Sequence, residues 1–272
     1  MNSKSPLVLL IDAGNTRVKW ACIEQSATLT LPVQWTQLGS VTHQNLEHLR
    51  AAWADLDVLE IVLSNVAGEK LGNTLLALLA SHFPQIPVHF FRSQAHCAGV
   101  QNQYQEPQRL GADRFASAIA AHYLYPDMAL VVATCGTATT VDAVDAAEFI
   151  GGMILPGLQL MAASLAKNTA QLPQIAESLG LQDAFAKNTD QAIVSGCLHA
   201  QVGAMLGAVE KLRQRSSRPV QLLISGGAAP FIIPQLKLQT NLIWHHVENL
   251  VLSGLFVATK LKSTALSSTP HF

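Results

Sequence analysis

The sequence predicts an α/β protein with two similar halves, in which mixed sheets are flanked by helices around a central cleft. The chain of 272 residues exceeds the usual size of a single hydrophobic core. A strand, a glycine-containing turn and a second strand are indicated at residues 7–23, and the same succession returns at residues 129–144. Apolar helices and strands follow each copy. The repeat therefore predicts one such sheet in each half.

The first half begins with five consecutive apolar residues, 7–11, a pattern typical of a strand that is covered on both faces. Asp12 follows, and the turn contains Gly14 and Asn15, two residue types that tolerate positive φ. A second strand resumes at Arg17. Behind it we expect a third strand at 28–35, a helix at 44–56, a strand at 59–64, a helix at 71–83 and a strand at 88–91.

The second half repeats this plan with strands at 129–133, 141–144 and 149–155 and a hydroxyl-rich glycine turn at 134–140. Helices are expected at 158–166, 190–214 and 247–261, with a strand at 220–225. Three strands followed by alternating helices and strands resemble the ribonuclease-H-like half-domain of the sugar kinase, Hsp70 and actin superfamily. The expected boundaries are 1–108 for the N-terminal half, 109–262 for the C-terminal half and 263–272 for a flexible tail.

Composition excludes several classes of function. Lys and Arg number 17 against 18 Asp and Glu, which gives a net charge of -1 and no basic footprint for nucleic acid or an anionic membrane. The four cysteines lie far apart without a Cys-x-x-Cys pair, so neither a zinc site nor a redox motif is predicted, and His245 and His246 lack metal-ligand spacing. The apolar stretch 128–141 is too short to span a bilayer. We therefore expect a cytoplasmic protein without nucleic-acid or membrane partners.

The two glycine turns are the first candidate for a binding site. A Gly-Asn-Thr turn presents backbone N–H groups that can hold anionic oxygens, and Asp12 offers a carboxylate to hydrated Mg²⁺. The alternative is an ordinary hairpin in which Asp12 and Asn15 only satisfy the turn backbone. The sequence has neither the GxxxxGK[ST] nor the GxGxxG motif, so a bound nucleotide would use the two turns rather than a P-loop or a Rossmann turn.

Asp113 is the candidate for proton transfer. It lies where residues 104–112 lead into a helix that is predicted to begin near Asp113 itself. A carboxylate at this place could accept the proton of a substrate hydroxyl as that hydroxyl attacks a γ-phosphate, and at its ordinary pKa it would be ionised at pH 7. The alternative is that Asp113 only caps the helix.

Several segments together resemble the type III pantothenate kinases. These segments are Asp12 to Thr16, Leu110 to Arg114, Gly136 to Thr140, Gly151 to Gly157, Ser164-Leu165, Thr169 to Pro173 and Lys187 to Thr189, which have the order and spacing of that family over nearly the whole chain. The resemblance implies the actin-like fold of two ribonuclease-H-like halves, a homodimer, and the ATP-dependent conversion of pantothenate to 4'-phosphopantothenate, the first step of coenzyme A synthesis. Another small-molecule kinase of the same fold, or a non-catalytic actin-like nucleotide-binding regulator, remains an alternative.

The same resemblance assigns roles to individual residues. Asp113 is implied as the general base, and Asp12 as the acid on the Mg²⁺ side. The implied ATP contacts are Asp12, Ala13, Gly14, Asn15, Thr16, Arg17, Val18, Lys19 and Thr137. The implied pantothenate contacts are Tyr104, Gly111, Ala112, Asp113, Arg114 and Thr189. Arg114 could hold the pantothenate carboxylate, or it could pair with a structural acid and set the pKa of Asp113.

One residue departs from the family pattern. The family commonly has Asp where this chain has Thr134, and that Asp ligates a monovalent cation, K⁺ or NH₄⁺. A threonine hydroxyl carries no charge, so this cation site is in doubt. The expected helix 190–214 carries small residues along its length, including Gly196, Gly203 and Gly207, which suit close packing against a second copy of the chain or against the protein's own core.

Overall fold

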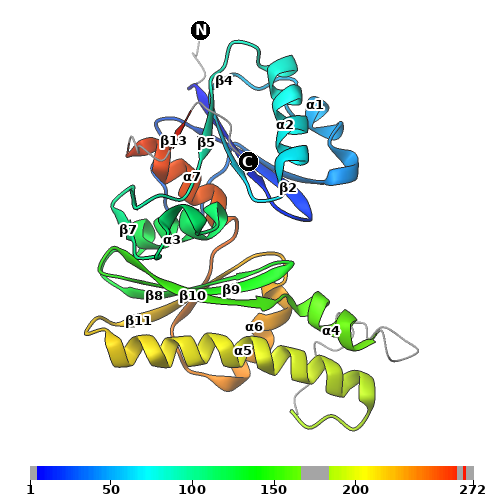
Figure 1. Ribbon diagram of the computed structural model, residues 1–272, viewed down its shortest axis with the longest axis vertical. Helices are drawn as coiled ribbons and strands as arrows, with labels where there is room; N and C mark the ends of the chain where they lie inside the picture. Colours follow the sequence, from blue (N-terminus) through cyan, green and yellow to red (C-terminus); the bar gives the residue numbers. More distant parts are fainter. Residues whose placement is uncertain (1–4, 167–183, 262–265, 268–272) are drawn as a thin grey trace. The chain divides into compact units, whose positions relative to one another are not determined.

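The structure is a computed structural model that describes residues 5–166, 184–261 and 266–267 (Figure 1). It consists of two compact units, Met1–Leu124 with Leu250–Phe272, and Tyr125–Asn249. The division differs from the expected one after residue 108, because helices α3 (Ala112–Leu124) and α7 (Leu250–Lys260) both belong to the first unit. These two helices pack so closely that a Cβ atom on Gly254 would overlap the backbone of Ala116. The chain therefore returns to the first unit at its C-terminal end.

The first unit contains a sheet with the strand order β13-β5-β4-β1-β2-β3. The central strand β1 is antiparallel to β2 and parallel to β4. The strands are β1 (Leu7–Ala13), β2 (Arg17–Glu24), β3 (Gln37–Thr42), β4 (Val58–Asn65), β5 (Val88–Phe91) and β13 (Leu266–Ser267). The strands β6 (His96–Cys97) and β7 (Val100–Asn102) pair antiparallel with each other and do not belong to this sheet.

The two faces of this sheet are used differently. Leu9, Ile11 and Ala13 of β1 belong to a core cluster that includes residues of helices α1 (His48–Ala52) and α2 (Glu69–His82). Side chains alternate along a strand, so Asp12 lies on the opposite face, and β1 contacts helix α7. The acid is therefore kept apart from the apolar core between the sheet and α2.

Most expected elements of the first half agree with the structure, but the third strand was wrong. Residues 28–35 contain no strand, and β3 lies at Gln37–Thr42 instead, paired with β2 from Arg17 to Cys22. Pro32 lacks an N–H group for a ladder hydrogen bond, which disfavours the earlier position. The expected helix 44–56 is reduced to the 3₁₀ turn His43–Asn45 and to α1. Within the expected flexible tail, β13 pairs with Phe90 and Phe91 of β5.

The second unit contains the strand order β12-β11-β8-β9-β10. Its elements are β8 (Ala129–Cys135), β9 (Ala138–Asp145), β10 (Glu148–Pro156), α4 (Leu158–Ala166), α5 (Thr189–Arg215), β11 (Val220–Ser225), α6 (Ala229–Gln239) and β12 (Trp244–His246). Among the described residues, α5 is the one helix that by length and composition could cross a membrane. It packs against β8, β9 and β11 along one side of the sheet, as the core helix of a soluble protein does (Figure 1).

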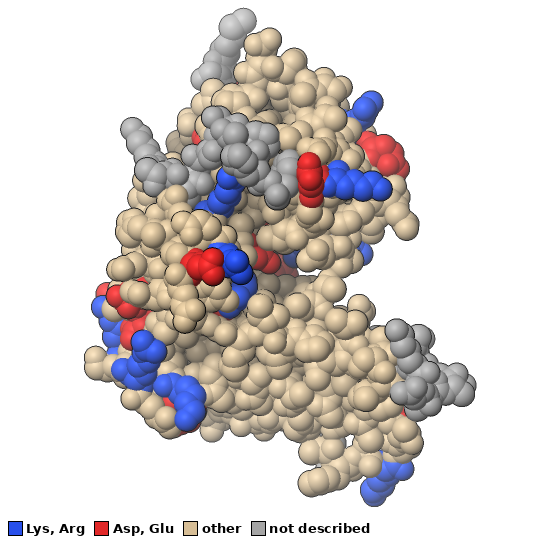
Figure 2. Space-filling model, viewed as in Figure 1, with Lys and Arg blue, Asp and Glu red and all other residues tan. Residues whose placement is uncertain are grey.

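Charged side chains are spread out rather than gathered in one place on the face drawn in Figure 2. On the face drawn in Figure 2, the Lys and Arg atoms lie interspersed with those of Asp and Glu among uncharged residues. This mixture matches the near balance of 17 basic and 18 acidic residues. The described part of that face accordingly lacks the continuous basic surface that nucleic-acid binding would use.

Candidate active site

The turn between β1 and β2 is closed by a hydrogen bond from the Gly14 N–H to the Arg17 carbonyl, at 3.1 Å. Neither Gly14 nor Asn15 adopts a positive φ, so the sequence-based reason for these residues was wrong. A Cβ atom on Gly14 would lie 3.4 Å from the Arg17 oxygen, an ordinary contact distance, so neither φ nor space requires a glycine here. Asn15, Thr16 and Arg17 are exposed at the tip of the turn.

His43 holds this turn from a neighbouring segment. Its Nε2 atom lies 2.9 Å from the Gly14 carbonyl oxygen, and because a carbonyl only accepts hydrogen bonds, Nε2 must carry the proton. Both backbone polar groups of Gly14 therefore have partners, the N–H through Arg17 and the carbonyl through His43. Sequence reasoning missed His43, which belongs to no motif and approaches the turn only in the folded chain.

Asp12 is the centre of a polar row that crosses three strands. Its register partners are Lys19 on β2 and Ser64 on β4, so the three side chains lie on the same face of the sheet. Asp12 Oδ1 is buried and makes no hydrogen bond within the described part of the chain, and the same is true of Ser64 Oγ. Asp12 Oδ1 therefore does not satisfy the turn backbone, contrary to the hairpin alternative. A buried carboxylate oxygen without a partner fits a site for Mg²⁺, whose preferred ligands are oxygen atoms.

The pKa of Asp12 is raised from 3.8 to about 7, chiefly by burial. The negative charge of Asp113 contributes to this increase, whereas the positive charge of Lys19 opposes it. The electrostatic effect of Asp113 on Asp12 means that the structure brings the two predicted acids together within the first unit. A bound cation would lower the pKa of both carboxyl groups by compensating their charges.

Asp113 lies in the first turn of α3, as the sequence predicted. Its Oδ1 accepts a hydrogen bond of 2.9 Å from the Arg114 N–H, so the carboxylate does contact the helix backbone. A Cβ atom on Gly111 would lie 2.6 Å from this oxygen, which explains the glycine. Burial raises the pKa of Asp113, while the backbone N–H and the charge of Arg114 oppose that increase. The expectation of an ordinary pKa was therefore wrong.

The buried Arg114 pairs with the half-buried Tyr104 next to Asp113. Arg114 is only 6% exposed, its Nη1 atom lies 3.4 Å from Tyr104 Oη, and its guanidinium carbon lies 5.8 Å from the centre of the Tyr104 ring. Tyr104 is placed by Asn102, whose Oδ1 accepts from the Tyr104 N–H at 3.0 Å. Asn102 Nδ2 in turn donates to Ser93 Oγ and to the Pro107 carbonyl. Asn102 and Ser93 are supporting residues that the sequence did not indicate.

The second unit carries the other glycine turn, between β8 and β9. The Gly136 N–H donates to the Ala138 carbonyl at 3.0 Å, and Gly136, Thr137 and Ala138 are exposed. The Gly157 N–H donates to the Thr137 carbonyl at 2.9 Å, and a Cβ atom on Gly157 would lie 2.5 Å from that oxygen. Gly226 packs in the same manner on Cys135. These two glycines therefore let neighbouring segments contact the turn backbone directly.

Thr134 lies just before this turn in a row of hydroxyl groups. Its register partners are Thr140 on β9 and Ser225 on β11, which places the three side chains on one face. The Oγ1 atoms of Thr134 and Thr140 are buried without a hydrogen-bond partner. The row therefore offers neutral hydroxyl oxygen atoms and no carboxylate.

Thr189 is the first residue of α5 and is exposed. The preceding Asn188 caps the helix, because its Oδ1 accepts from the Gln191 N–H at 2.9 Å. The Lys187 to Thr189 segment is thus a helix start, and Thr189 and Thr137 belong to a different unit from Asp12 and Asp113. The expected Thr169 to Pro173 segment lies outside the described residues.

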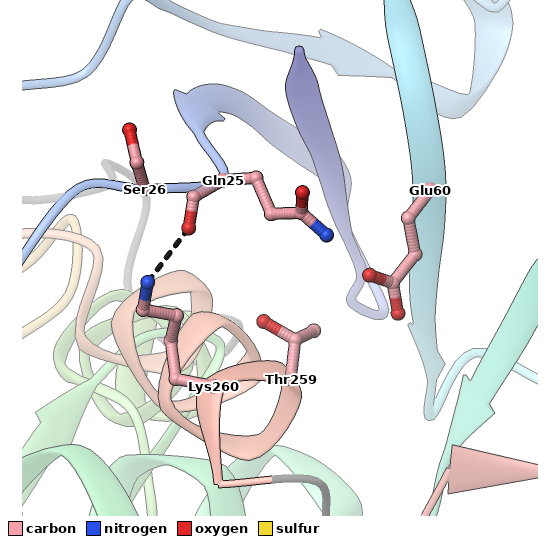
Figure 3. Close-up of a pocket in the computed structure, with 5 residues that line it drawn as sticks. All are labelled: Gln25, Ser26, Glu60, Thr259 and Lys260. Carbon is pink, nitrogen blue, oxygen red and sulfur yellow. Dashed lines mark hydrogen bonds between the residues drawn. The ribbon is translucent and has the colours of Figure 1, made fainter. Parts of the chain in front are cut away.

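A separate pocket of roughly 320 Å³ lies at the other end of the first sheet (Figure 3). Its lining consists of Gln25, Ser26, Glu60, Thr259 and Lys260. Lys260 Nζ donates to the Gln25 carbonyl at 2.7 Å, which partly satisfies the lysine. Glu60 precedes Ser64 by four residues on β4, or about 13 Å along a strand. This pocket is therefore distinct from the surroundings of Asp12.

The comparison with known proteins identifies the family. The sequence model of the type III pantothenate kinases matches residues 8–211. The chain belongs to the type III pantothenate kinase family. A type III pantothenate kinase of Janthinobacterium sp. (strain Marseille) is 51% identical over 253 residues, covering 92% of this chain and 96% of the relative. That of Herminiimonas arsenicoxydans is 46% identical, with the same coverage.

A solved structure supports the fold of this type III pantothenate kinase. The (R)-2-hydroxyglutaryl-CoA dehydratase component A of Acidaminococcus fermentans matches with a TM-score of 0.54 and 12% identity, covering 95% of this chain and 100% of the other. At this identity the likeness concerns the fold alone. It agrees with the expected actin-like α/β class, in which two mixed sheets are flanked by helices.

Proposed function

We propose that this type III pantothenate kinase transfers the γ-phosphate of ATP to the primary hydroxyl of pantothenate and forms 4'-phosphopantothenate. The observation that carries the proposal is the half-buried acid pair of the first unit, in which Asp113 lies close enough to Asp12 to raise its pKa and stands next to the buried Arg114. Family membership over residues 8–211 supplies the substrate class. The reaction is the first step of coenzyme A synthesis, and we place it in the cytoplasm.

Asp113 acts as the general base in this proposal. It accepts the hydroxyl proton of pantothenate while the hydroxyl oxygen forms a bond to the γ-phosphorus and the bond between that phosphorus and the bridging oxygen breaks, so that ADP leaves. Burial raises the pKa of Asp113 and so makes its carboxylate a stronger proton acceptor than an exposed aspartate. The hydrogen bond from the Arg114 N–H keeps that carboxylate in place.

The remaining first-unit residues hold the reactants. Arg114, positioned by Tyr104, binds the pantothenate carboxylate, while the turn from Ala13 to Val18 and the Lys19 side chain bind ATP phosphates. Asp12 would hold Mg²⁺, and Mg²⁺ when bound neutralises charge on the phosphates. Gly111 leaves room for the Asp113 carboxylate. Ala112 and Thr189 are proposed as further pantothenate contacts, and Thr137 is proposed as an ATP contact.

A substrate panel tests the proposal. Purified protein is incubated with ATP, Mg²⁺ and either pantothenate, a set of sugars or a set of hydroxy acids, and ADP release is followed together with the mass of the product. Pantothenate should be the substrate with the highest kcat/KM, and its product should gain one phosphate. Turnover of a sugar without turnover of pantothenate would identify another small-molecule kinase, and nucleotide binding without any turnover would identify a regulator.

The proposal includes a homodimer formed through the second unit. Gly196, Gly203 and Gly207 lie on an exposed side of α5, and a Cβ atom on any of them would meet no atom of the described residues within 4 Å. Close packing against a second copy of the chain is the use that we propose for these glycines. Large exposed apolar side chains also lie on β10 and α4 of the same unit, namely Met153, Ile154, Leu160 and Leu165.

Sedimentation velocity tests the dimer. The unaltered protein should sediment as a dimer at micromolar concentration, and Gly203→Leu should shift it toward monomer because the larger side chain blocks close helix packing. Gly227→Leu, which changes an exposed glycine without a positive φ, controls for a general effect of glycine replacement. A monomer with full activity would contradict the dimer.

Weak or absent activation by monovalent cations is a further part of the proposal. Thr134 Oγ1 and Thr140 Oγ1 are buried and unpartnered, but neither supplies the negative charge that retains a weakly held ion. Activity in sodium, potassium and ammonium buffers at fixed ionic strength should differ little, and Thr134→Asp should increase the response to potassium. Strong saturable activation of the unaltered protein by potassium would contradict this part.

A further inference from the structure

Ser64 lies beside Asp12 but has no part in the reaction proposed above. It is the register partner of Asp12 in the parallel pair of β4 with β1, so neighbouring strands place the two side chains on one face about 4.8 Å apart. The residue is fully buried, with 0% of its surface exposed. Ser64 Oγ and Asp12 Oδ1 nevertheless make no hydrogen bond, either to each other or to another group.

Two neighbouring buried oxygen atoms without partners are unusual, because burial of a polar group costs free energy when its hydrogen bonds are not replaced. A shared species between them would remove this cost. That species is a hydrated cation rather than an anion, since the Asp12 carboxylate repels anions. Mg²⁺ in particular keeps several water molecules and uses only one or two protein carboxylates, so its waters need hydrogen-bond acceptors close to the carboxylate.

We propose that Ser64 is a positioning residue for the metal, in which Oγ accepts a hydrogen bond from a water molecule on the Mg²⁺ held by Asp12. The inference rests on the metal role of Asp12 in the proposed function. Ser64 fixes the direction of this water, while Asp12 supplies the charge. Hydrogen-bonding groups around a metal site commonly change metal affinity by about 10- to 100-fold.

Metal binding without catalysis tests this role. The dissociation constant of Mn²⁺, used in place of Mg²⁺, is measured by electron paramagnetic resonance of free Mn²⁺ with the full chain and ADP, in the absence of pantothenate. Ser64→Ala should raise this constant by about 10-fold. Ser64→Cys, which preserves the side-chain size but offers only a weakly hydrogen-bonding thiol, should raise it similarly. Neither variant should lower the melting temperature of the metal-free protein, because the hydroxyl forms no bond there.

Two further variants serve as controls for the Ser64 variants. Ser93→Ala removes another buried serine hydroxyl, one that accepts from Asn102 Nδ2 at 3.0 Å, and should lower the melting temperature without changing the Mn²⁺ constant. Asp12→Asn should raise the Mn²⁺ constant more than Ser64→Ala does. An unchanged constant in both Ser64 variants, with a raised one in Asp12→Asn, would overturn the role of Ser64 alone. An unchanged constant in all three would also remove Asp12 from the metal site of the proposed function.

Discussion

Asp12→Asn should stabilise the metal-free protein at alkaline pH while impairing its use of Mg²⁺. The folded pKa of Asp12, about 7, lies above its ordinary value of 3.8. Between these values the unfolded chain has released the proton while the folded chain still holds it, so the unfolded state binds fewer protons. The free energy of unfolding therefore decreases as pH rises from about 4 to 7, and it no longer changes from this group above about 8.

The size of this effect follows from the same two values. Each unit by which the pKa in the folded chain exceeds 3.8 corresponds to about 1.36 kcal/mol of unfolding free energy. The free energy of unfolding is therefore lower at pH 8 by up to about 4 kcal/mol. Asparagine has no charge to bury but still leaves an amide without partners, at a cost of about 1 to 3 kcal/mol. We expect a net gain of about 1 to 3 kcal/mol at pH 8, or a melting temperature higher by roughly 3 to 10 °C.

Thermal unfolding with a chelator at pH 5 and pH 8 measures this difference. The melting temperature of Asp12→Asn should exceed that of the unaltered protein more at pH 8 than at pH 5, and added Mg²⁺ and ADP should stabilise the unaltered protein more than the variant. Asp55→Asn, which neutralises an exposed carboxylate of the same unit, controls for net charge. A variant that is less stable at pH 8, or an equal pH dependence of both proteins, would refute the burial argument.

Three further predictions concern the site. Asp113→Asn should lower kcat by about 10²- to 10⁴-fold with little change in ADP affinity measured by calorimetry. Because burial raises the pKa of Asp113, kcat/KM of the unaltered enzyme should begin to fall with decreasing pH above the pH range in which an ordinary aspartate is protonated. Near-normal turnover of the variant would mean that Asp113 serves only as a contact of the helix backbone. His43→Ala should raise the KM for ATP more than it lowers kcat, and His43→Gln, which keeps a donor for the Gly14 carbonyl, should recover part of the loss. Equal kinetics of both variants would show that this hydrogen bond does not contribute to ATP binding. Gly157→Ala should lower the melting temperature and raise the KM for ATP, because its Cβ would press on the Thr137 carbonyl; an unchanged KM would show that the turn tolerates displacement.

Local patterns predicted those elements whose burial is uniform. The five apolar residues of β1 lie in the middle of the first sheet, and the strand 220–225 and the helix 158–166 have the predicted bounds. Strand β3 was missed because it lies toward the edge of the sheet and its residues are largely exposed, including Leu38 at 47%, so its sequence lacks an apolar alternation. Helix α6 was missed because its sequence contains Pro230 and Pro234, and proline usually argues against a helix. Pro230 lies in the first turn of α6, where proline is tolerated.

The limits of sequence reasoning were different at the site. Asp12 and Asp113 could be proposed from the sequence because each follows a local signal, the end of an apolar strand and the start of a helix. Ser64 and His43 could not, because their positions depend on the parallel register of β4 with β1 and on the approach of the 3₁₀ turn to Gly14. The raised pKa of Asp113 was also missed, since burial depends on tertiary packing.

The buried polar atoms around Asp12 connect stability with function. A carboxylate whose pKa is raised to about 7 and a neighbouring serine hydroxyl without a partner both destabilise the empty folded chain. A hydrated divalent cation would remove both costs at once, by compensating the charge of Asp12 and by satisfying Ser64 through water. Part of the metal's binding free energy is then the recovery of stability that the empty site lacks. For this reason the variants that stabilise the empty protein, Asp12→Asn above all, are the ones expected to bind the metal least well.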